Sequence, residues 1–231
     1  MIAQDLLRKE HTLEVNKSNY SIDCFHNAPL TAGVFKSNGI ERRRHLWESL
    51  LQVDAFGHIM EFGVYKGKTM KHIAKMFPNK ICWGFDSFEG LPEPWYTSSS
   101  DEEASHPAGR FHWNELDDKP EFADNVKLVA GWFNETLPQW IFENPGTVCF
   151  LHIDCDLYSS TATVLELLND QIVPGTVIVF DEMYPWGDYN LYDLWADGEY
   201  KALGEWLEKY DRAFVPLNHS RHQQCSLRVT K

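Results

Sequence analysis

Short apolar runs alternate with amphipathic segments from about residue 40 to the C-terminus. The apolar runs predict strands at residues 58–62, 81–85, 126–130, 148–153 and 176–180. Helical periodicity follows at residues 67–77, 137–142 and 159–168. The run at 148–153 is apolar throughout, which is typical of a strand that is buried on both faces of a parallel sheet. The alternation predicts an α/β fold built on such a sheet.

The last third of the chain carries a different pattern. An aromatic and acidic stretch at residues 183–200 precedes a helix that ends near residue 210. Two alternating segments, 213–217 and 223–229, have no helix between them and therefore predict an antiparallel pair. We expect a Rossmann-like, seven-stranded and mostly parallel sheet whose last strand is antiparallel, with helices on both faces. The chain is expected to form one domain over residues 1–231, with 1–40 as an N-terminal cap and 91–120 as an inserted lid loop.

Composition narrows the class of ligand. The chain has 34 acidic and 21 basic residues and a formal charge of -13, so its surface repels polyanions and nucleic acid is not an expected partner. The arginine run at residues 42–44 is interpreted as a solvated helix face, with a sulfate or carboxylate partner as the alternative. The charged N-terminal segment excludes a signal peptide, no apolar stretch approaches the ~20 residues of a membrane span, and the cysteines form no CxxC pair. These features predict a cytoplasmic protein with no membrane partner.

Two glycines mark the point where the first predicted strand passes into its helix. Gly63 and Gly67 let the backbone turn sharply and approach a ligand without an intervening Cβ atom. Asp86 ends the next strand about 20 residues later, the offset at which a carboxylate reaches the ribose hydroxyls of a bound cofactor. Glu61 lies at the end of a buried strand and needs a cation or hydrogen-bond donors, because an unpaired buried carboxylate is costly. Together these residues predict a ribose-bearing cofactor, and an ammonium group on it would satisfy Glu61.

Two alternatives accompany this interpretation. Gly67-Lys68-Thr69 resembles the end of a P-loop, and an aspartate follows the fourth predicted strand as it would in a nucleotide hydrolase. A P-loop needs four residues between its glycines, whereas only three separate Gly63 from Gly67, so the spacing argues against it. The second alternative is a binding module that keeps the fold without catalysis.

Acidic residues gather after the fourth and fifth predicted strands. Asp154 and Asp156 follow the fourth, and Asp181 and Glu182 follow the fifth. The ends of parallel strands share one edge of the sheet, so these carboxylates are expected to converge and to require a cation, for which all-oxygen ligands favour Mg²⁺ or another hard divalent ion. We assign Asp154, Asp181 and Glu182 as metal ligands, while for Asp156 a cap on the following helix is an equal alternative. His152 is interpreted as a packed strand histidine.

Several stretches of the chain together resemble the macrocin O-methyltransferase family, whose members methylate sugar hydroxyls of macrolides and other small natural products. The stretches are EFGVYKGKT (61–69), GFDSFEGLPE (84–93), LVAGWFNETLP (128–138), LHIDCDLYSST (151–161) and PGTVIVFDE (174–182). They cover the chain from about residue 57 to 182, and the combination of DSFEGLP with DxDLYxST is highly specific. The resemblance implies a class I methyltransferase fold and transfer of a methyl group from S-adenosylmethionine to a hydroxyl oxygen of a small molecule.

The resemblance also implies the residues of the cofactor site. S-adenosylmethionine would contact residues of the matching stretches, with its adenine near the last three of this series: Glu61, Gly63, Tyr65, Gly67, Thr69, Asp86, Ser87, Phe88, Asp154, Gly131, Trp132 and Phe133. Family members more usually carry two aspartates after the fifth strand, where this chain has Asp181 and Glu182. Related catechol-type enzymes have a lysine base at the position of Leu157, so that base is not available here.

The implied reaction suggests roles for the acids and for the loops. A bound metal would orient the acceptor hydroxyl and lower its pKa, and Asp154 or Asp156 would accept the proton. Acceptor specificity is expected in two irregular segments, residues 91–120 and 184–200, because long loops in a compact domain often bind ligands. The aromatic and basic residues singled out there include Trp95, His106, Arg110, His112 and Trp113 in the first segment, and Trp186, Tyr189, Tyr192 and Trp195 in the second. The same aromatic residues would equally suit a hydrophobic latch or the surface of a homodimer.

Overall fold

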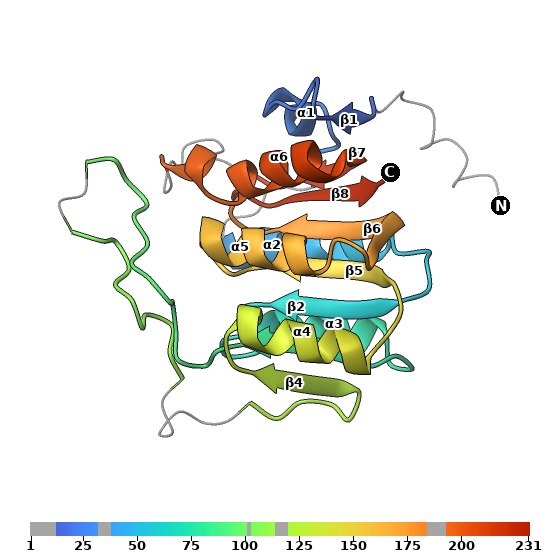
Figure 1. The fold of residues 1–231 in the computed structure, drawn as a ribbon, viewed down its shortest axis with the longest axis vertical. Coiled ribbons are helices and arrows are strands. Elements are labelled where there is room, and N and C mark those ends of the chain that lie inside the picture. Colours follow the sequence, from blue (N-terminus) through green and yellow to red (C-terminus); the bar gives the residue numbers. More distant parts are fainter. Residues whose placement is uncertain (1–12, 32–37, 101–102, 114–119, 184–192) are drawn as a thin grey trace.

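The computed structural model describes residues 13–31, 38–100, 103–113, 120–183 and 193–231 (Figure 1). The strands of these residues form one sheet with the order β1-β7-β8-β6-β5-β2-β3-β4. They are β1 (Val15–Asn16), β2 (His58–Phe62), β3 (Cys82–Asp86), β4 (Val126–Ala130), β5 (Val148–Ile153), β6 (Ile172–Phe180), β7 (Ala213–His219) and β8 (Cys225–Val229). Strands β2 to β6 pair in parallel, whereas β8 is antiparallel to both of its neighbours. The predicted Rossmann-like class is confirmed, and β1 extends the expected sheet at its β7 edge.

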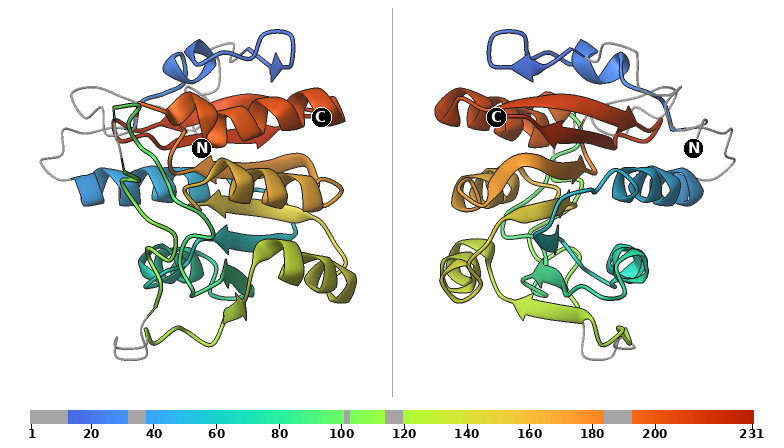
Figure 2. Two further views of the ribbon diagram at one scale, coloured as in Figure 1. Left: turned by 60° about the vertical axis from the view of Figure 1, so that its left-hand side comes forward. Right: turned by 90° about the vertical axis from the view of Figure 1, so that its right-hand side faces the viewer.

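Helices cover both faces of the sheet. They are α1 (Asp23–His26), α2 (Asn38–Leu50), α3 (Lys68–Met76), α4 (Phe133–Glu143), α5 (Tyr158–Leu167) and α6 (Glu199–Tyr210), with a short 3-10 helix η1 (Trp195–Asp197) before α6. Figure 2 shows α2 and α3 on one face and α4, α5 and α6 on the other. Among the helices of the described residues, none combines the length and the apolar character that crossing a membrane requires.

Most strands lie where the sequence pattern predicts them. β2, β4 and β5 begin and end at the predicted residues, and β7 and β8 form the predicted antiparallel pair. β6 differs, because it begins at Ile172 and contains Pro174 and Gly175, which the pattern predicts as a turn before the strand. At this point the pairing of β6 with β5 shifts its register, so the Pro-Gly pair lies in a bulge. A proline is tolerated there because a bulge does not require its missing N–H.

Alternation along the strands divides the core into two clusters. Met60 of β2 packs with side chains of α4, α5 and α6, whereas its neighbour Ile59 packs with Leu46 of α2 and Ile73 of α3. The same alternation places the carboxylate of Glu61 on the face that α2 and α3 cover. This face therefore receives the buried polar groups of the central strands.

The carboxyl ends of β2, β3, β5 and β6 meet at one edge of the sheet (Figure 1). The segment after β3 runs along this edge from β3 toward the start of α6, as the green trace in Figure 1 and Figure 2 shows. Ligands of open α/β sheets bind in the crevice outside the carboxyl ends of the strands. The fold thus brings the predicted site residues and the predicted lid loop to the same place.

Candidate active site

A cavity of about 1480 Å³ lies at this edge of the sheet. Pockets for one small ligand commonly measure about 300–1,000 Å³, so there is room for a cofactor and a second molecule. The predicted cofactor residues that line the cavity are Gly63, Tyr65, Thr69, Asp86, Ser87, Trp132, Phe133 and Asp154. The predicted cofactor residues that are not part of its wall are Glu61, Gly67, Phe88 and Gly131.

The turn between β2 and α3 depends on close approach of the backbone. Gly63 has a φ of 91°, and a Cβ atom on it would lie 1.8 Å from the carbonyl oxygen of Asp154. Gly67 precedes the first residue of α3 with a φ of 69°, and a Cβ atom there would lie 2.3 Å from the ring of Phe122. Only glycine meets both requirements. The turn therefore brings the ends of β2 and β5 together at the wall of the cavity.

We expect Gly63→Ala to lower the free energy of unfolding by about 3 kcal/mol or more, because the new methyl group meets a main-chain oxygen in a strained conformation. Gly109→Ala is the matched control. Its φ is 76°, but the nearest atom to a Cβ atom there is 3.9 Å away, so only the strain of about 1 kcal/mol remains. Chemical denaturation of both variants measures the difference. Equal losses would show that backbone strain alone, and not the contact with Asp154, determines the need for glycine.

Asp86 joins the loop after β2 to the loop after β3 at the wall of the cavity. Its Oδ2 accepts a hydrogen bond from the N–H of Tyr65 and its Oδ1 accepts one from the N–H of Phe88, each at 2.7 Å. Burial raises the pKa of this carboxyl, and the N–H donors act in the opposite direction. Each carboxylate oxygen has a second lone pair, so Asp86 can also accept hydroxyl groups from a ribose. The predicted contact is compatible with this geometry.

The neighbouring turns are closed by hydrogen bonds around the same strand end. The hydroxyl of Ser87 donates to the carbonyl oxygen of Gly90 at 3.0 Å, which closes the turn after β3. The N–H of Gly131 donates to the carbonyl oxygen of Asp86 at 3.0 Å, and α4 begins shortly afterwards at Phe133. These bonds place the start of α4 beside the end of β3, on the wall where the resemblance puts the adenine.

The three predicted metal ligands converge on a single guanidinium group. Arg42 of α2 contacts Asp181, and its Nη2 lies 3.8 Å from an oxygen of Asp154 and 3.6 Å from an oxygen of Glu182. For Arg42 the structure therefore shows the carboxylate partners and not a solvated helix face. The side chain crosses from the helix to the ends of β5 and β6 and supplies a positive charge at the point where the carboxylates meet.

More carboxyl groups surround this point than Arg42 can neutralise. Glu199 at the start of α6 is fully buried and accepts a hydrogen bond from the N–H of Glu182 at 2.9 Å. Burial raises the pKa values of Glu182 and Glu199 well above their usual range, and the charges of Asp154 and Asp156 raise them further. Burial likewise raises the pKa of Asp156 to about 8, with Asp154 as the next cause. A bound cation would relieve the mutual repulsion of these groups.

Asp156 does not cap the helix that follows it. The residue at the N-cap of α5 is Leu157, and no side chain makes a capping hydrogen bond there. Asp156 lines the cavity and has a φ of 64°, a left-handed conformation that is uncommon for residues other than glycine. Strain of this kind is more often found at binding and catalytic sites than elsewhere. The geometry favours a role of Asp156 at the cavity over the capping alternative.

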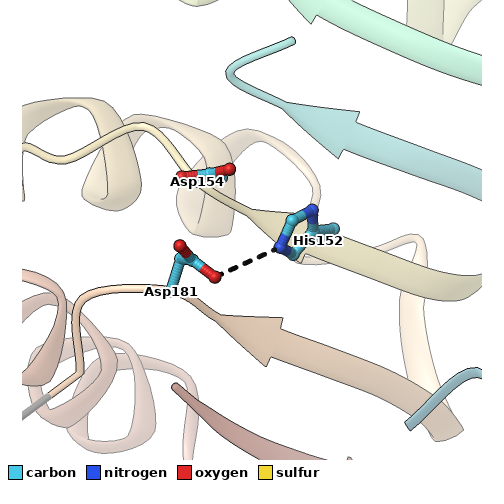
Figure 3. Close-up of side chains that lie close together, drawn as sticks. All are labelled: His152, Asp154 and Asp181. Atoms are coloured by element: carbon cyan, nitrogen blue, oxygen red, sulfur yellow. Dashed lines mark ion pairs between the residues drawn. The ribbon is translucent and has the colours of Figure 1, made fainter. Parts of the chain in front are cut away.

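His152 is a buried histidine of β5, as the sequence interpretation has it, but it also lies beside Asp154 and Asp181 (Figure 3), which that interpretation did not foresee. Its Nδ1 is 2.9 Å from an oxygen of Glu61, and its Nε2 is 3.7 Å from an oxygen of Asp181. Metal-binding atoms of His152, Asp154 and Asp181 all lie within 4.8 Å of one another. Burial raises the pKa of Glu61, and the hydrogen bond with His152 opposes this. The sequence pattern carries no signal for this contact, because it depends on the pairing of β2 with β5, which sets Glu61 directly opposite His152.

The two segments that are predicted to control specificity contact each other. Trp95 and His106 form a backbone bridge with N–H to oxygen distances of 2.8 and 3.1 Å, and both residues line the cavity. The N–H of Asp193 in the second segment donates to the carbonyl oxygen of Thr97 in the first at 2.9 Å. Of the aromatic residues predicted to act in the second segment, Trp186, Tyr189 and Tyr192 lie outside the described residues.

Known proteins with similar sequences indicate the family of this chain. Residues 27–192 match the macrocin-O-methyltransferase (TylF) family. An 8-demethyl-8-(2,3-dimethoxy-alpha-L-rhamnosyl)-tetracenomycin-C 4'-O-methyltransferase from Streptomyces olivaceus is 26% identical over 161 residues, which are 62% of this chain and 59% of that protein. A mycinamicin III 3''-O-methyltransferase from Micromonospora griseorubida is 26% identical over 158 residues, which are 60% of each chain. The matched region thus spans less than two thirds of the length of these two relatives.

A solved structure supports the fold. The crystal structure of a calicheamicin methyltransferase has a TM-score of 0.62 at 24% identity and covers 92% of this chain and 88% of that chain. The family match extends over the glycine turn, Asp86 and all three predicted metal ligands. The chain therefore belongs to the macrocin-O-methyltransferase family.

Proposed function

We propose that this protein transfers the methyl group of S-adenosylmethionine to a hydroxyl oxygen of a small, sugar-bearing molecule, with a divalent metal ion at the carboxylate cluster. The strongest support is that the glycine turn, Asp86 and three acids at the ends of β5 and β6, Asp154, Asp156 and Glu182, line one cavity. Family membership supports the reaction type. The rhamnosyl group in the name of the Streptomyces olivaceus relative supports a sugar hydroxyl as the acceptor.

The cofactor would occupy the part of the cavity that β2, β3 and α4 form. Asp86 would accept the ribose hydroxyls, and Trp132 and Phe133 would border the adenine. The absence of a side chain at Gly63 keeps that part of the wall open. For Glu61, contact with the ammonium group of the cofactor stays a prediction, because its side chain is buried behind the wall.

The donor groups suit a hard divalent cation. Asp154, Asp181 and Glu182 offer oxygen atoms around the point where the guanidinium of Arg42 lies, and such ligands favour Mg²⁺. His152 adds a nitrogen: if its Nδ1–H donates to the neighbouring carboxylate, its Nε2 is free to bind a metal. A mixed oxygen and nitrogen donor set would accommodate Mn²⁺ as well as Mg²⁺.

Methyl transfer requires an acceptor oxygen in line with the sulfonium methyl group and a group that takes the hydroxyl proton. As the new carbon–oxygen bond forms, the carbon–sulfur bond breaks and S-adenosylhomocysteine leaves. When bound, the metal would supply positive charge that lowers the pKa of the hydroxyl. Asp156 is the better candidate for the base, since it lines the cavity and burial raises the pKa of its carboxyl. Asp154 shares in the proposed cation site, so its charge is already engaged.

Separate measurements of binding and turnover test the proposal. Isothermal titration calorimetry should detect binding of S-adenosylhomocysteine. Incubation with S-adenosylmethionine, Mg²⁺ and a panel of glycosides should give a methylated product in mass spectrometry, and EDTA should suppress it. Cofactor binding without any methylated product would favour a non-catalytic binding module. Release of phosphate from ATP, without binding of S-adenosylhomocysteine, would favour the P-loop alternative.

A further inference from the structure

The wall of the cavity that α2 and α3 form is basic, although the net charge of the protein is -13. Besides Arg42, the basic residues that α2, α3 and the loop before α3 contribute to this wall are Arg43, Lys66, Lys68, Lys71, His72 and Lys75. Within the described residues, these segments contribute no carboxylate to the wall. The carboxylate cluster lies on the ends of β5 and β6. The cavity therefore has sides of opposite charge.

Several of these cations lack a partner of opposite charge in the described part of the chain. Lys71 lies 5.8 Å from the centre of the Phe122 ring, a cation–π contact. Arg43, Lys68 and Lys75 form no ion pair with any described carboxylate, whereas Lys17, Arg44, Lys209 and Lys231 each pair with one. The positive charge on this wall is thus available to a ligand.

The lysines of α3 do not stabilise the helix itself, so helix stability does not explain why they are there. Lys71 and Lys75 lie four residues apart on one face of the helix, where like charges are destabilising. Lys68 is the first residue of α3, at the end where the helix dipole disfavours a positive charge, and the first turn has no acidic residue. An anion bound at this wall would remove both costs.

Arg43, His72 and Lys75 all line this wall of the cavity. Burial lowers the pKa of His72, and the positive charges of Arg43 and Lys75 lower it further. Arg43 belongs to α2 and Lys75 to α3, so the two cations approach the same region from different helices. A guanidinium and an ammonium group in this arrangement suit the oxygens of a phosphate or sulfate.

The cofactor does not account for this charge. S-adenosylmethionine carries one carboxylate together with an ammonium and a sulfonium group, so its binding adds net positive charge to the cavity. The volume of about 1480 Å³ leaves room for a second molecule. Resting on the proposed function, we infer that the acceptor is an anionic ester, whose phosphate or sulfate group is bound by Arg43, His72 and Lys75 while its hydroxyl is methylated.

Pyrophosphate binding, measured by isothermal titration calorimetry in EDTA at low ionic strength, tests the anion site without turnover. EDTA removes metal ions that would bind the probe at the carboxylate cluster. We expect the wild-type protein to bind pyrophosphate and the double variant Arg43→Gln, Lys75→Gln to bind it at least about tenfold more weakly. Arg44→Gln is the matched control, because Arg44 pairs with Glu48 and is not part of the cavity wall. Its pyrophosphate affinity should not change, nor should the affinity of any variant for S-adenosylhomocysteine.

Turnover assays identify which kind of acceptor carries the anionic group. The panel contains sugar phosphates, nucleoside diphosphate sugars, sugar sulfates and neutral glycosides. We expect the KM for the preferred anionic acceptor to rise about tenfold in the double variant with little change in kcat. Equal pyrophosphate affinity in wild type and double variant, a parallel loss of affinity for S-adenosylhomocysteine, or methylation of neutral glycosides alone would each overturn the inference. A wild-type protein that binds pyrophosphate but not S-adenosylhomocysteine would overturn the proposed function and leave the anion site standing.

Discussion

Asp181→Asn should abolish methyl transfer without weakening the binding of S-adenosylhomocysteine. The substitution keeps the shape of the side chain but removes the charge that contacts Arg42 and that would hold the metal. Asp181 is 5% exposed and is not part of the cavity wall, so the cofactor pocket should stay intact. We expect kcat to fall at least about 1,000-fold, which corresponds to ~4 kcal/mol in activation free energy, in assays with saturating S-adenosylmethionine and Mg²⁺.

Asp124→Asn is the control for this substitution, because Asp124 is an exposed aspartate outside the cavity wall. It should leave kcat unchanged. Mn²⁺ binding, followed by electron paramagnetic resonance, distinguishes loss of the metal from loss of the fold, and circular dichroism checks the latter. If Asp181→Asn bound Mn²⁺ and turned over like the wild type, Asp181 would not be a metal ligand.

Arg42→Gln is expected to tighten metal binding at least about tenfold. The guanidinium lies among the three carboxylates at the point that the metal would use, so a metal has to displace it. In EDTA the same variant should unfold at a lower temperature, because the buried carboxylates lose their positively charged partner. Mg²⁺ should restore the unfolding temperature. Mn²⁺ titration and thermal unfolding with and without Mg²⁺ measure both effects.

Arg44→Gln again provides the comparison, since it removes the same charge from the same helix, where Arg44 pairs with Glu48 and not with the carboxylate cluster. Its metal affinity should equal that of the wild type. An Arg42→Gln protein with unchanged metal affinity would mean that the guanidinium and the metal use different positions. In that case the metal would have to bind elsewhere, and the proposal for the cofactor pocket would not change.

The central strands could be predicted because burial on both faces leaves a continuous apolar run, as in β5, all of whose residues are buried. β6 begins earlier than predicted because Pro174 and Gly175, usual markers of a turn, occupy a bulge. β1 could not be predicted, since Val15 and Asn16 are too few residues to show an alternating pattern. Pairing with β7, and not local preference, makes them a strand.

The carboxylates of the site could be predicted because the topology of a parallel sheet brings strand ends together. Arg42 and Glu199 could not, since they come from α2 and α6 and reach the cluster only through tertiary packing. Hydrophobic periodicity indicates which face of a helix or strand is buried, but not which side chain of another element packs against that face. His152 shows the same limit, because its contact with Glu61 depends on the register between β2 and β5.

A chimera that imports residues 91–113 from a relative without hydroxyl side chains at positions 98 and 99, while keeping Asp193, would lose side-chain hydrogen bonds that join the two cavity loops. Asp193 accepts bonds from the hydroxyls of Ser98 and Ser99 and from the N–H of Ser99, and it donates to Thr97. The loops are therefore one interlocked unit, although they are far apart in the sequence. To transfer the acceptor specificity of one family member to another, both loops have to be exchanged in the same chimera.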